Sequence, residues 1–206
     1  MSILSDIELV RGVLIGDDES CIRMMMEKYA DFNGVPYNAQ KGELTTAFNG
    51  RKCIFKSVSM DYPDRGFDDP HVFLLCWSVA HQSSTEEAVR MILDTVVERI
   101  RGVPFVLVGT QIDKRLSMLI EKYDSSGHTK YTPMPLNKAE SFAKRIGASK
   151  YLECSEVTGE GVDEVFEDAF ELGHNYALEQ LRGYRRKMSA AAAQTPKERK
   201  LSCITQ

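Results

Sequence analysis

The sequence contains few of the residues that usually mark metal or redox chemistry. Its 206 residues include five cysteines, four histidines and a single tryptophan. The cysteines show no C-x-x-C spacing and four of them lie in or beside apolar runs, so a disulfide framework is not indicated and a reducing compartment is expected. The histidines are scattered, with no metal-binding or triad spacing. We therefore predict neither a metal site nor a catalytic histidine.

Long apolar runs and a strong excess of one charge are also missing. No run approaches the length of a transmembrane helix, and the short, non-basic start of the chain does not predict a signal peptide. The net charge of -4 gives no reason to expect nucleic acid as a partner. The apolar and charged fractions, 43% and 27%, are those of an ordinary packed domain, and the length suits one α/β domain with a tail.

The sequence does contain apolar runs of strand length that alternate with helical patterns. Buried strands are predicted at residues 9–16, 72–79, 105–109 and 151–155. Asn49-Gly50 indicates a hairpin between residues 44–48 and 53–58. Helices are predicted at residues 22–32, 83–101, 137–147 and 162–185, the second and third opened by capping patterns at Ser83 and Asn137. This order predicts an α/β fold: a doubly wound, mostly parallel sheet with one antiparallel hairpin edge strand and helices on both faces.

A polar quartet follows the strand at residues 105–109. It consists of Thr110, Gln111, Ile112 and Asp113. Because ligands of parallel α/β sheets bind at the carboxyl ends of the strands, Asp113 is placed where a carboxylate can accept two N–H groups from the edge of a guanine. Taken alone, such an Asp more often caps a turn or a helix.

Several segments together resemble the Ras superfamily of small GTPases, and within it most closely the Rho family. They are H-V-F-L-L-C-W-S at 71–78, V-G-T-Q-I-D at 108–113, Y-L-E-C-S at 151–155 and G-V-D-E-V-F-E-D-A at 161–169. An extra segment at about 114–135 lies where Rho proteins carry an insert helix. The resemblance implies a P-loop NTPase-like small G domain over residues 1–185. It also implies Rho regulators or effectors as partners, and GTP or GDP with Mg²⁺ as the family's ligands.

The resemblance fails in the loop after the first strand. The family's loop is G-x-x-x-x-G-K-S/T, in which backbone N–H groups and the Lys hold the phosphates and the hydroxyl binds Mg²⁺. Here Gly16 keeps the first position, and the residues that follow are Asp17, Asp18, Glu19, Ser20, Cys21, Ile22 and Arg23. Cys21 replaces the second glycine, Ile22 the lysine and Arg23 the hydroxyl residue.

The degenerate loop also carries the wrong charge. Carboxylates at residues 17–19 stand where phosphate oxygens belong, and two like charges ~5 Å apart repel by about 3 kcal/mol at an effective dielectric of 20. A single such pair would weaken binding by roughly a hundredfold. Arg23 is expected to be a solvated first-turn residue, although it is long enough to reach back toward a phosphate. The loop predicts weak or no nucleotide binding.

The switch segments have lost their characteristic residues as well. Tyr37 falls at the Mg²⁺-binding Thr of the first switch. In the second switch the catalytic Gln becomes Pro63 in one register and Arg65 in another, and neither register keeps the Gly that senses the γ-phosphate. We therefore assign no catalytic residue and no metal ligand, and we leave enzymatic activity undecided.

The base-binding side is retained in part. Under the resemblance Asp113 reads guanine, Gln111 covers the ring or ribose with its stem, and Ser155 braces Asp113. Glu156 replaces an Ala whose N–H meets guanine O6, so its N–H remains but its carboxylate is unhelpful there. An alternative fits equally well, in which Asp113 and Ser155 only tie two loops together.

The last part of the chain carries a different signal. Residues 186–206 are expected to form a flexible, basic tail, disordered beyond Met188. Cys203 stands fourth from the end in C-I-T-Q, which looks like a prenylation box of the farnesyl type, although Thr205 is not aliphatic. One prenyl chain with a basic segment suffices for peripheral membrane attachment. The interpretation predicts a cytoplasmic protein at the cytosolic face of the plasma membrane or an endomembrane.

Three functions remain open on the sequence. The first is a membrane-anchored Rho-like protein without GTP hydrolysis, with weak or no GTP binding, that acts through protein partners. The second is a divergent but working GTP-binding switch. In the third, the old site holds another ligand or is filled by side chains such as Ile22 and Tyr37.

Overall fold

A seven-stranded sheet forms the centre of the computed structural model, which describes residues 7–17, 20–58, 69–81, 86–96, 101–115 and 133–194. The strands are β1 (Leu9–Gly16), β2 (Tyr37–Asn38), β3 (Glu43–Phe48), β4 (Arg51–Ser57), β5 (Val72–Ser78), β6 (Phe105–Thr110) and β7 (Lys150–Glu153). Their order is β2-β3-β4-β1-β5-β6-β7. In this spatial order, the neighbouring pairs β4–β1, β1–β5, β5–β6 and β6–β7 are parallel, and the β2–β3 and β3–β4 pairs are antiparallel. The predicted fold class is confirmed.

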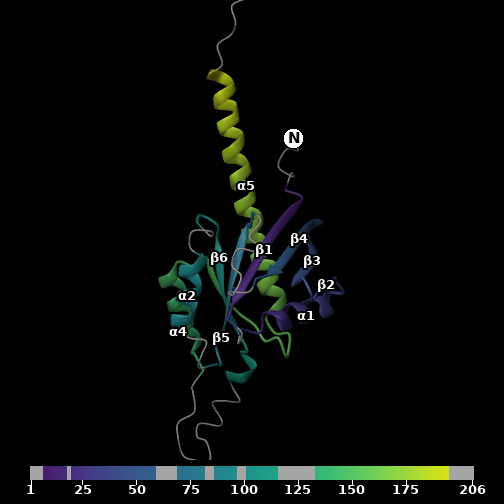
Figure 1. Ribbon diagram of the computed structural model, residues 1–206, viewed down its shortest axis with the longest axis vertical. Helices are drawn as coiled ribbons and strands as arrows, with labels where there is room; N and C mark the ends of the chain where they lie inside the picture. The colour runs from purple at the N-terminus through teal and green to yellow at the C-terminus, as the bar shows by residue number, and fades with distance from the viewer. Residues whose placement is uncertain are drawn as a thin grey trace, which may run out of the picture.

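Helices cover both faces of this sheet (Figure 1). They are α1 (Ile22–Asn33), α2 (Glu86–Val96), α4 (Leu136–Ile146) and α5 (Val162–Gln194). Helices α1 and α5 lie on one face, and α2 and α4 lie on the other. Each pair encloses its own apolar core because every residue of β5, in the middle of the sheet, is buried on both faces. Met25 and Met26 are fully buried in the α1–α5 core, as the helical spacing of the methionines predicted.

The hairpin prediction is also confirmed. Asn49 and Gly50 have φ values of 50° and 76°, the left-handed conformations that a two-residue hairpin turn requires. Asn and Gly adopt these angles at low cost, so the turn fixes the β3–β4 register, in which Phe48 faces Arg51.

Two helix ends differ from prediction. Helix α4 begins at Leu136 with Pro135 as its N-cap, one residue before Asn137, so Asn137 lies inside the first turn and is not the cap. Helix α5 continues to Gln194, past the boundary predicted at residue 185, and disorder directly after Met188 is wrong. The physical reason is that alanine has the highest helix propensity, and residues 190–193 are all alanine.

Several predictions concern residues that the structure does not describe. They include Asp18 and Glu19, the second switch, the start of the 83–101 helix, most of the insert and Cys203. These remain predictions. Among the residues described, no helix is long and apolar enough to cross a membrane.

Candidate functional site

The candidate site lies where β1, β6 and β7 end. These strands are parallel, so the loops that follow them, at residues 16–22, 110–115 and 153–160, meet at the carboxyl edge of the sheet. This is the edge at which open α/β sheets bind ligands. The loop that resembles a phosphate loop and the two loops that resemble base-binding motifs are therefore brought together, as predicted.

Gly16 and Cys21 of the first loop have particular backbone requirements. Cys21 has φ 53° and stands directly before α1, with no side-chain cap on the helix. An L-residue pays roughly 1–2 kcal/mol for this left-handed conformation, which glycine adopts freely. Gly16 is required for a different reason, because a Cβ there would lie 2.4 Å from the Cys76 carbonyl oxygen and 2.5 Å from Ser20 Oγ. Cys21 thus has a glycine-like backbone conformation at the position where the resemblance expects a glycine.

The described side chains of Ser20, Ile22 and Arg23 each contact other residues of the protein. Ser20 is fully buried, and its Oγ donates to the Asp17 carbonyl oxygen at 2.5 Å. Ile22 is partly buried and packs against the α1–α5 core. The Arg23 Nε donates to Glu27 at 2.9 Å across one helical turn, with 71% of the Arg23 side chain exposed. The prediction of a solvated Arg23 is confirmed, and the first turn of α1 presents no lysine.

Tyr37, the residue at the position of the first-switch Thr, belongs to β2. It pairs with Leu44 of β3 and packs, partly buried, against the α1–α5 core. Burial is the main cause of the raised pKa of its hydroxyl, and Glu27 raises that pKa further. Ile22 and Tyr37 thus both pack against the α1–α5 core.

Gln111 crosses from the base-binding loop to the phosphate-like loop. Gln111 is 3% exposed and has a φ of 63°. Its side-chain Oε1 accepts a hydrogen bond from the Ser78 hydroxyl at 2.8 Å. Its Nε2 donates to Cys21 Sγ at 2.8 Å. The side chain is therefore held inside the protein by contacts at both ends. The neighbouring Thr110 also makes a contact inside the protein, because its Oγ1 donates to the Trp77 carbonyl oxygen at 3.1 Å.

The carboxylate of Glu156 closes this corner of the site. Glu156 is 4% exposed, and its Oε2 accepts the backbone N–H of Gln111 at 3.3 Å. Burial raises the pKa of the Cys21 thiol, the Gln111 hydrogen bond lowers it, and Glu156 raises it again. Burial and Glu156 therefore favour the protonated form of the Cys21 thiol, and a carboxyl side chain is buried where the resemblance expects an alanine.

Asp113 and Ser155 form the contact that the sequence predicted. The Ser155 hydroxyl donates to Asp113 Oδ1 at 2.6 Å, and Ser155 is fully buried. The same Oγ accepts the backbone N–H groups of Val157 at 3.3 Å and Thr158 at 3.1 Å. Ser155 thus orients Asp113 and shapes the loop after β7 at the same time.

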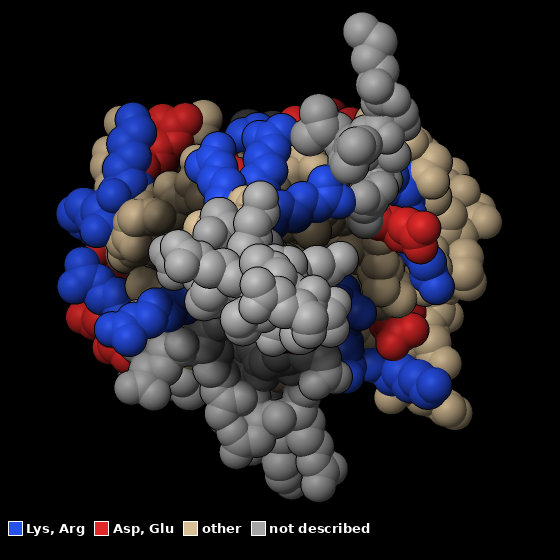
Figure 2. Space-filling view, turned by 90° about the horizontal axis from the view of Figure 1, so that it is seen from above, with Lys and Arg blue, Asp and Glu red and all other residues tan. Residues whose placement is uncertain are grey.

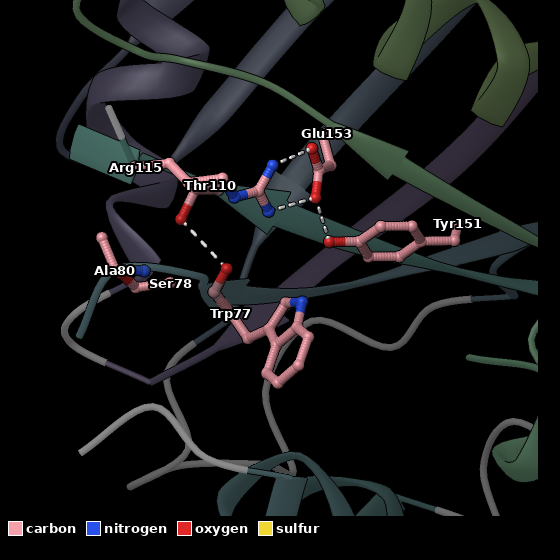
Figure 3. A network of polar contacts seen from close by, with 7 residues as sticks. All are labelled: Trp77, Ser78, Ala80, Thr110, Arg115, Tyr151 and Glu153. Atoms are coloured by element: carbon pink, nitrogen blue, oxygen red, sulfur yellow. Dashed lines mark hydrogen bonds and ion pairs between the residues drawn. The ribbon is translucent and has the colours of Figure 1, made fainter. Parts of the chain in front are cut away.

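A second connection between the same two loops was not predicted (Figure 3). Arg115 donates to both carboxylate oxygens of Glu153, at 2.8 and 2.6 Å. The Tyr151 hydroxyl donates to Glu153 Oε1 at 2.7 Å. Burial, and then Glu153, raise the pKa of the Tyr151 hydroxyl. A side chain at Gly109 would collide with that hydroxyl, which explains a glycine inside β6.

Comparison with known proteins identifies the class of this fold and site. A family model described as "Ras: Ras family" matches residues 60–174, more than half of the chain, and the match begins after the phosphate-like loop. The chain therefore belongs to the Ras family.

The curated relatives are Rho-type proteins. "GTP-binding protein RHO1" of Candida albicans is 35% identical over 128 residues, which cover 59% of this chain and 64% of that protein. "GTP-binding protein RHO1" of Eremothecium gossypii is 32% identical over 139 residues, 67% of this chain and 61% of that protein. "GTP-binding protein rho5" of Schizosaccharomyces pombe is 34% identical over 103 residues, half of each chain. The chain thus spans half to less than two thirds of the length of these relatives.

The residues present fit a guanine nucleotide only in part. Asp113, the base-reading residue under the resemblance, accepts the Ser155 hydroxyl through Oδ1. At the phosphate side the charge-neutralising lysine and the metal-binding hydroxyl are replaced by Ile22 and Arg23, whose side chains are used elsewhere. No group of His, Cys, Asp and Glu side chains within the described part of the chain is arranged to hold a metal ion. Residues 22 and 23 therefore offer neither the lysine nor the hydroxyl with which the family holds a triphosphate and Mg²⁺.

Proposed function

We propose that this chain is a Rho-type member of the Ras family that signals through protein contacts without a nucleotide cycle. It binds GTP weakly or not at all, and it does not hydrolyse it. Rho regulators and effectors are the partner class. A prenylated Cys203 with its basic neighbours would hold it at the cytosolic face of a membrane.

The observation that carries this proposal is the first turn of α1. A lysine that follows the loop contributes charge-assisted hydrogen bonds to the phosphates, each worth about 1.5–3 kcal/mol. Ile22 supplies none, and Arg23 is paired with Glu27 on the surface. The buried Glu156 side chain occupies the base side, where the resemblance expects an alanine.

The competing function, a divergent GTP-binding switch, is favoured by a specific contact. Ser155 donates to Asp113 at 2.6 Å, which supports base recognition by Asp113, and the relatives are named GTP-binding proteins. Under this alternative the family's ligands, GTP or GDP with Mg²⁺, would bind with low affinity and exchange fast.

A titration separates the two functions. Purified protein is titrated with fluorescent GTP and GDP analogues, with and without Mg²⁺, and its nucleotide content as purified is measured. We expect no Mg²⁺-dependent binding at micromolar concentrations. Binding at micromolar or lower concentration that depends on Mg²⁺ and is lost in Asp113→Ala would contradict the proposal and support the switch. Binding unchanged in Asp113→Ala would place the ligand outside the base site.

A further inference from the structure

The end of the domain opposite the candidate site has its own charge character. The chain has a net charge of -4, yet Lys and Arg outnumber Asp and Glu on the face from which α5 leaves the domain (Figure 2). Strand register places Arg11 of β1 and Lys52 of β4 near this amino-terminal edge, and Arg101 lies four residues before the start of β6. All three side chains are exposed. This basic pole is defined here by Arg11, Lys52 and Arg101.

Two partly buried histidines lie beside arginines of this end. Burial lowers the pKa of His71, and Arg11 lowers it further, while Asp69 acts in the opposite direction. His174 of α5 follows the same pattern, with burial first and Arg51 second. At the other end of the domain, Glu156, Glu160 and Asp163 follow β7.

Helix α5 projects from this pole into solvent (Figure 1). On its projecting part Tyr184 is 61% exposed and Met188 is 54% exposed, four residues apart on one face. Leu181, partly buried, continues the same stripe toward the domain. Leu181, Tyr184 and Met188 occupy successive a, d and a positions of a heptad, which is the spacing of a helix-pairing seam.

Basic residues flank the stripe on both sides. At about 100° of rotation per residue, Arg185 and Lys187 fall on opposite sides of Tyr184 and Met188, at the e and g positions that set the choice of partner in paired helices. The positive charges on both sides make the stripe complementary to a helix with acidic flanks.

We propose that the projecting part of α5 and the basic pole at its base bind an amphipathic helix with acidic flanks, supplied by a partner protein. The partner's apolar face covers Leu181, Tyr184 and Met188. Its carboxylates meet Arg185 and Lys187, and the end that reaches the domain faces Arg11 and Arg101. This deepens the proposed function, since it names a class of protein partner, and it places that partner away from the nucleotide-like site.

The test uses the full chain and two designed peptides. Both peptides are amphipathic helices of about three heptads with Leu at a and d, and they differ only in Glu or Lys at e and g. Binding is measured by fluorescence anisotropy at low and high salt. We expect the Glu peptide to bind at least tenfold more tightly than the Lys peptide, with a difference that shrinks as salt screens the charges.

Substitutions identify which residues form the binding surface. Tyr184→Ala with Met188→Ala should weaken the Glu peptide about tenfold or more, and Arg185→Glu with Lys187→Glu should reverse the preference between the peptides. Met91→Ala is the matched control, because Met91 is 70% exposed on α2, far from α5 in Figure 1, and it should change nothing. Circular dichroism verifies that each variant keeps its helix content. Nucleotide titration of the same variants should be unchanged, which separates this proposal from the proposed function.

Three outcomes would overturn the inference. One is equal binding of the two peptides or binding of neither. The second is binding to vesicles of phosphatidylcholine and phosphatidylserine, but not to the Glu peptide, that the same variants abolish, which would make the surface a lipid contact. The third is concentration-dependent dimerisation abolished by Tyr184→Ala with Met188→Ala, which would make it a contact between copies of this chain.

Discussion

Replacing Arg115 with Ala tests whether the two base-side loops depend on their ion pair. Arg115 and Glu153 are joined by two hydrogen bonds, and 21% of the arginine side chain and 15% of the glutamate side chain are exposed. Breaking a fully buried pair costs about 3–5 kcal/mol because one charge is left uncompensated. Partial exposure lets water solvate Glu153, and Tyr151 still donates to it, so we expect a cost of about 2 kcal/mol.

Thermal unfolding followed by circular dichroism measures this cost. For a domain of this size 1 kcal/mol corresponds to about 2–4 °C, so Arg115→Ala should lower the Tm by roughly 4–8 °C. Arg23→Ala is the control, since it removes an exposed pair across one helical turn and should shift the Tm by less than about 2 °C.

A double-mutant cycle isolates the pair itself. Glu153→Gln removes the charge but keeps an acceptor, and Arg115→Ala with Glu153→Gln should be less destabilised than the sum of the single variants. The reasoning would be refuted if Arg115→Ala shifted the Tm no more than Arg23→Ala does, or if the two substitutions at positions 115 and 153 were additive.

Four further predictions address the site, the core edge and the tail. Ser155→Ala removes the hydroxyl that serves Asp113, Val157 and Thr158, and should cost about 2 kcal/mol in a urea titration, whereas Ser141→Ala on the exposed face of α4 should cost less than about 1 kcal/mol. Burial lowers the pKa of His71 in the folded protein, so as the pH falls the unfolded chain binds a proton at this residue before the folded protein does. The free energy of unfolding should therefore decrease as the pH drops below about 6.5. His71→Gln should show a smaller fall in Tm between about pH 7.5 and 5.5. Cys21→Gly with Ile22→Lys and Arg23→Ser restores the glycine, the lysine and the hydroxyl, and should tighten fluorescent GDP binding by about tenfold or more in Mg²⁺; no gain would mean that Glu156 and the remaining acidic loop residues decide the affinity. Cys203→Ser should shift the protein expressed in eukaryotic cells from the membrane to the soluble fraction, and an unchanged distribution would exclude Cys203 as the anchor.

Local patterns were sufficient to predict most of the fold. The strand at residues 9–16 and the Asn49-Gly50 turn follow from apolar runs and turn chemistry, both of which act over a few neighbouring residues. Strand β2 is only two residues long and carries no such pattern. The end of α5 was placed too early because the Ala-rich segment was interpreted from its low complexity and not from its helix propensity.

The contacts of the site were predictable only where a motif named both partners. Asp113 and Ser155 were paired through their separate motifs, and their hydrogen bond at 2.6 Å confirms it. Arg115 and Glu153 lie 38 residues apart, and Gln111 and Cys21 lie 90 apart. Neither pair has a spacing that marks it in the sequence. The bidentate pair had one available signal, an arginine two residues after Asp113 and a glutamate two residues before Ser155.

The two sides of the site differ in what else their residues do for the fold. Asp113, Ser155 and Glu153 tie the loops after β6 and β7 together through buried or partly buried hydrogen bonds, so losing them would destabilise the domain whether or not a base is bound. The phosphate-side lysine and hydroxyl have no comparable structural duty. Ile22 packs against the core in place of the lysine, and Arg23 pairs on the surface in place of the hydroxyl residue. The proposed loss of the nucleotide cycle predicts this combination of base-side motifs that are present and a changed phosphate side. Ser155→Ala therefore tests the stability of the domain more directly than it tests nucleotide recognition. The variant with Cys21→Gly, Ile22→Lys and Arg23→Ser is the more direct test of recognition, because in it the base side can act together with a lysine and a hydroxyl at the phosphate side.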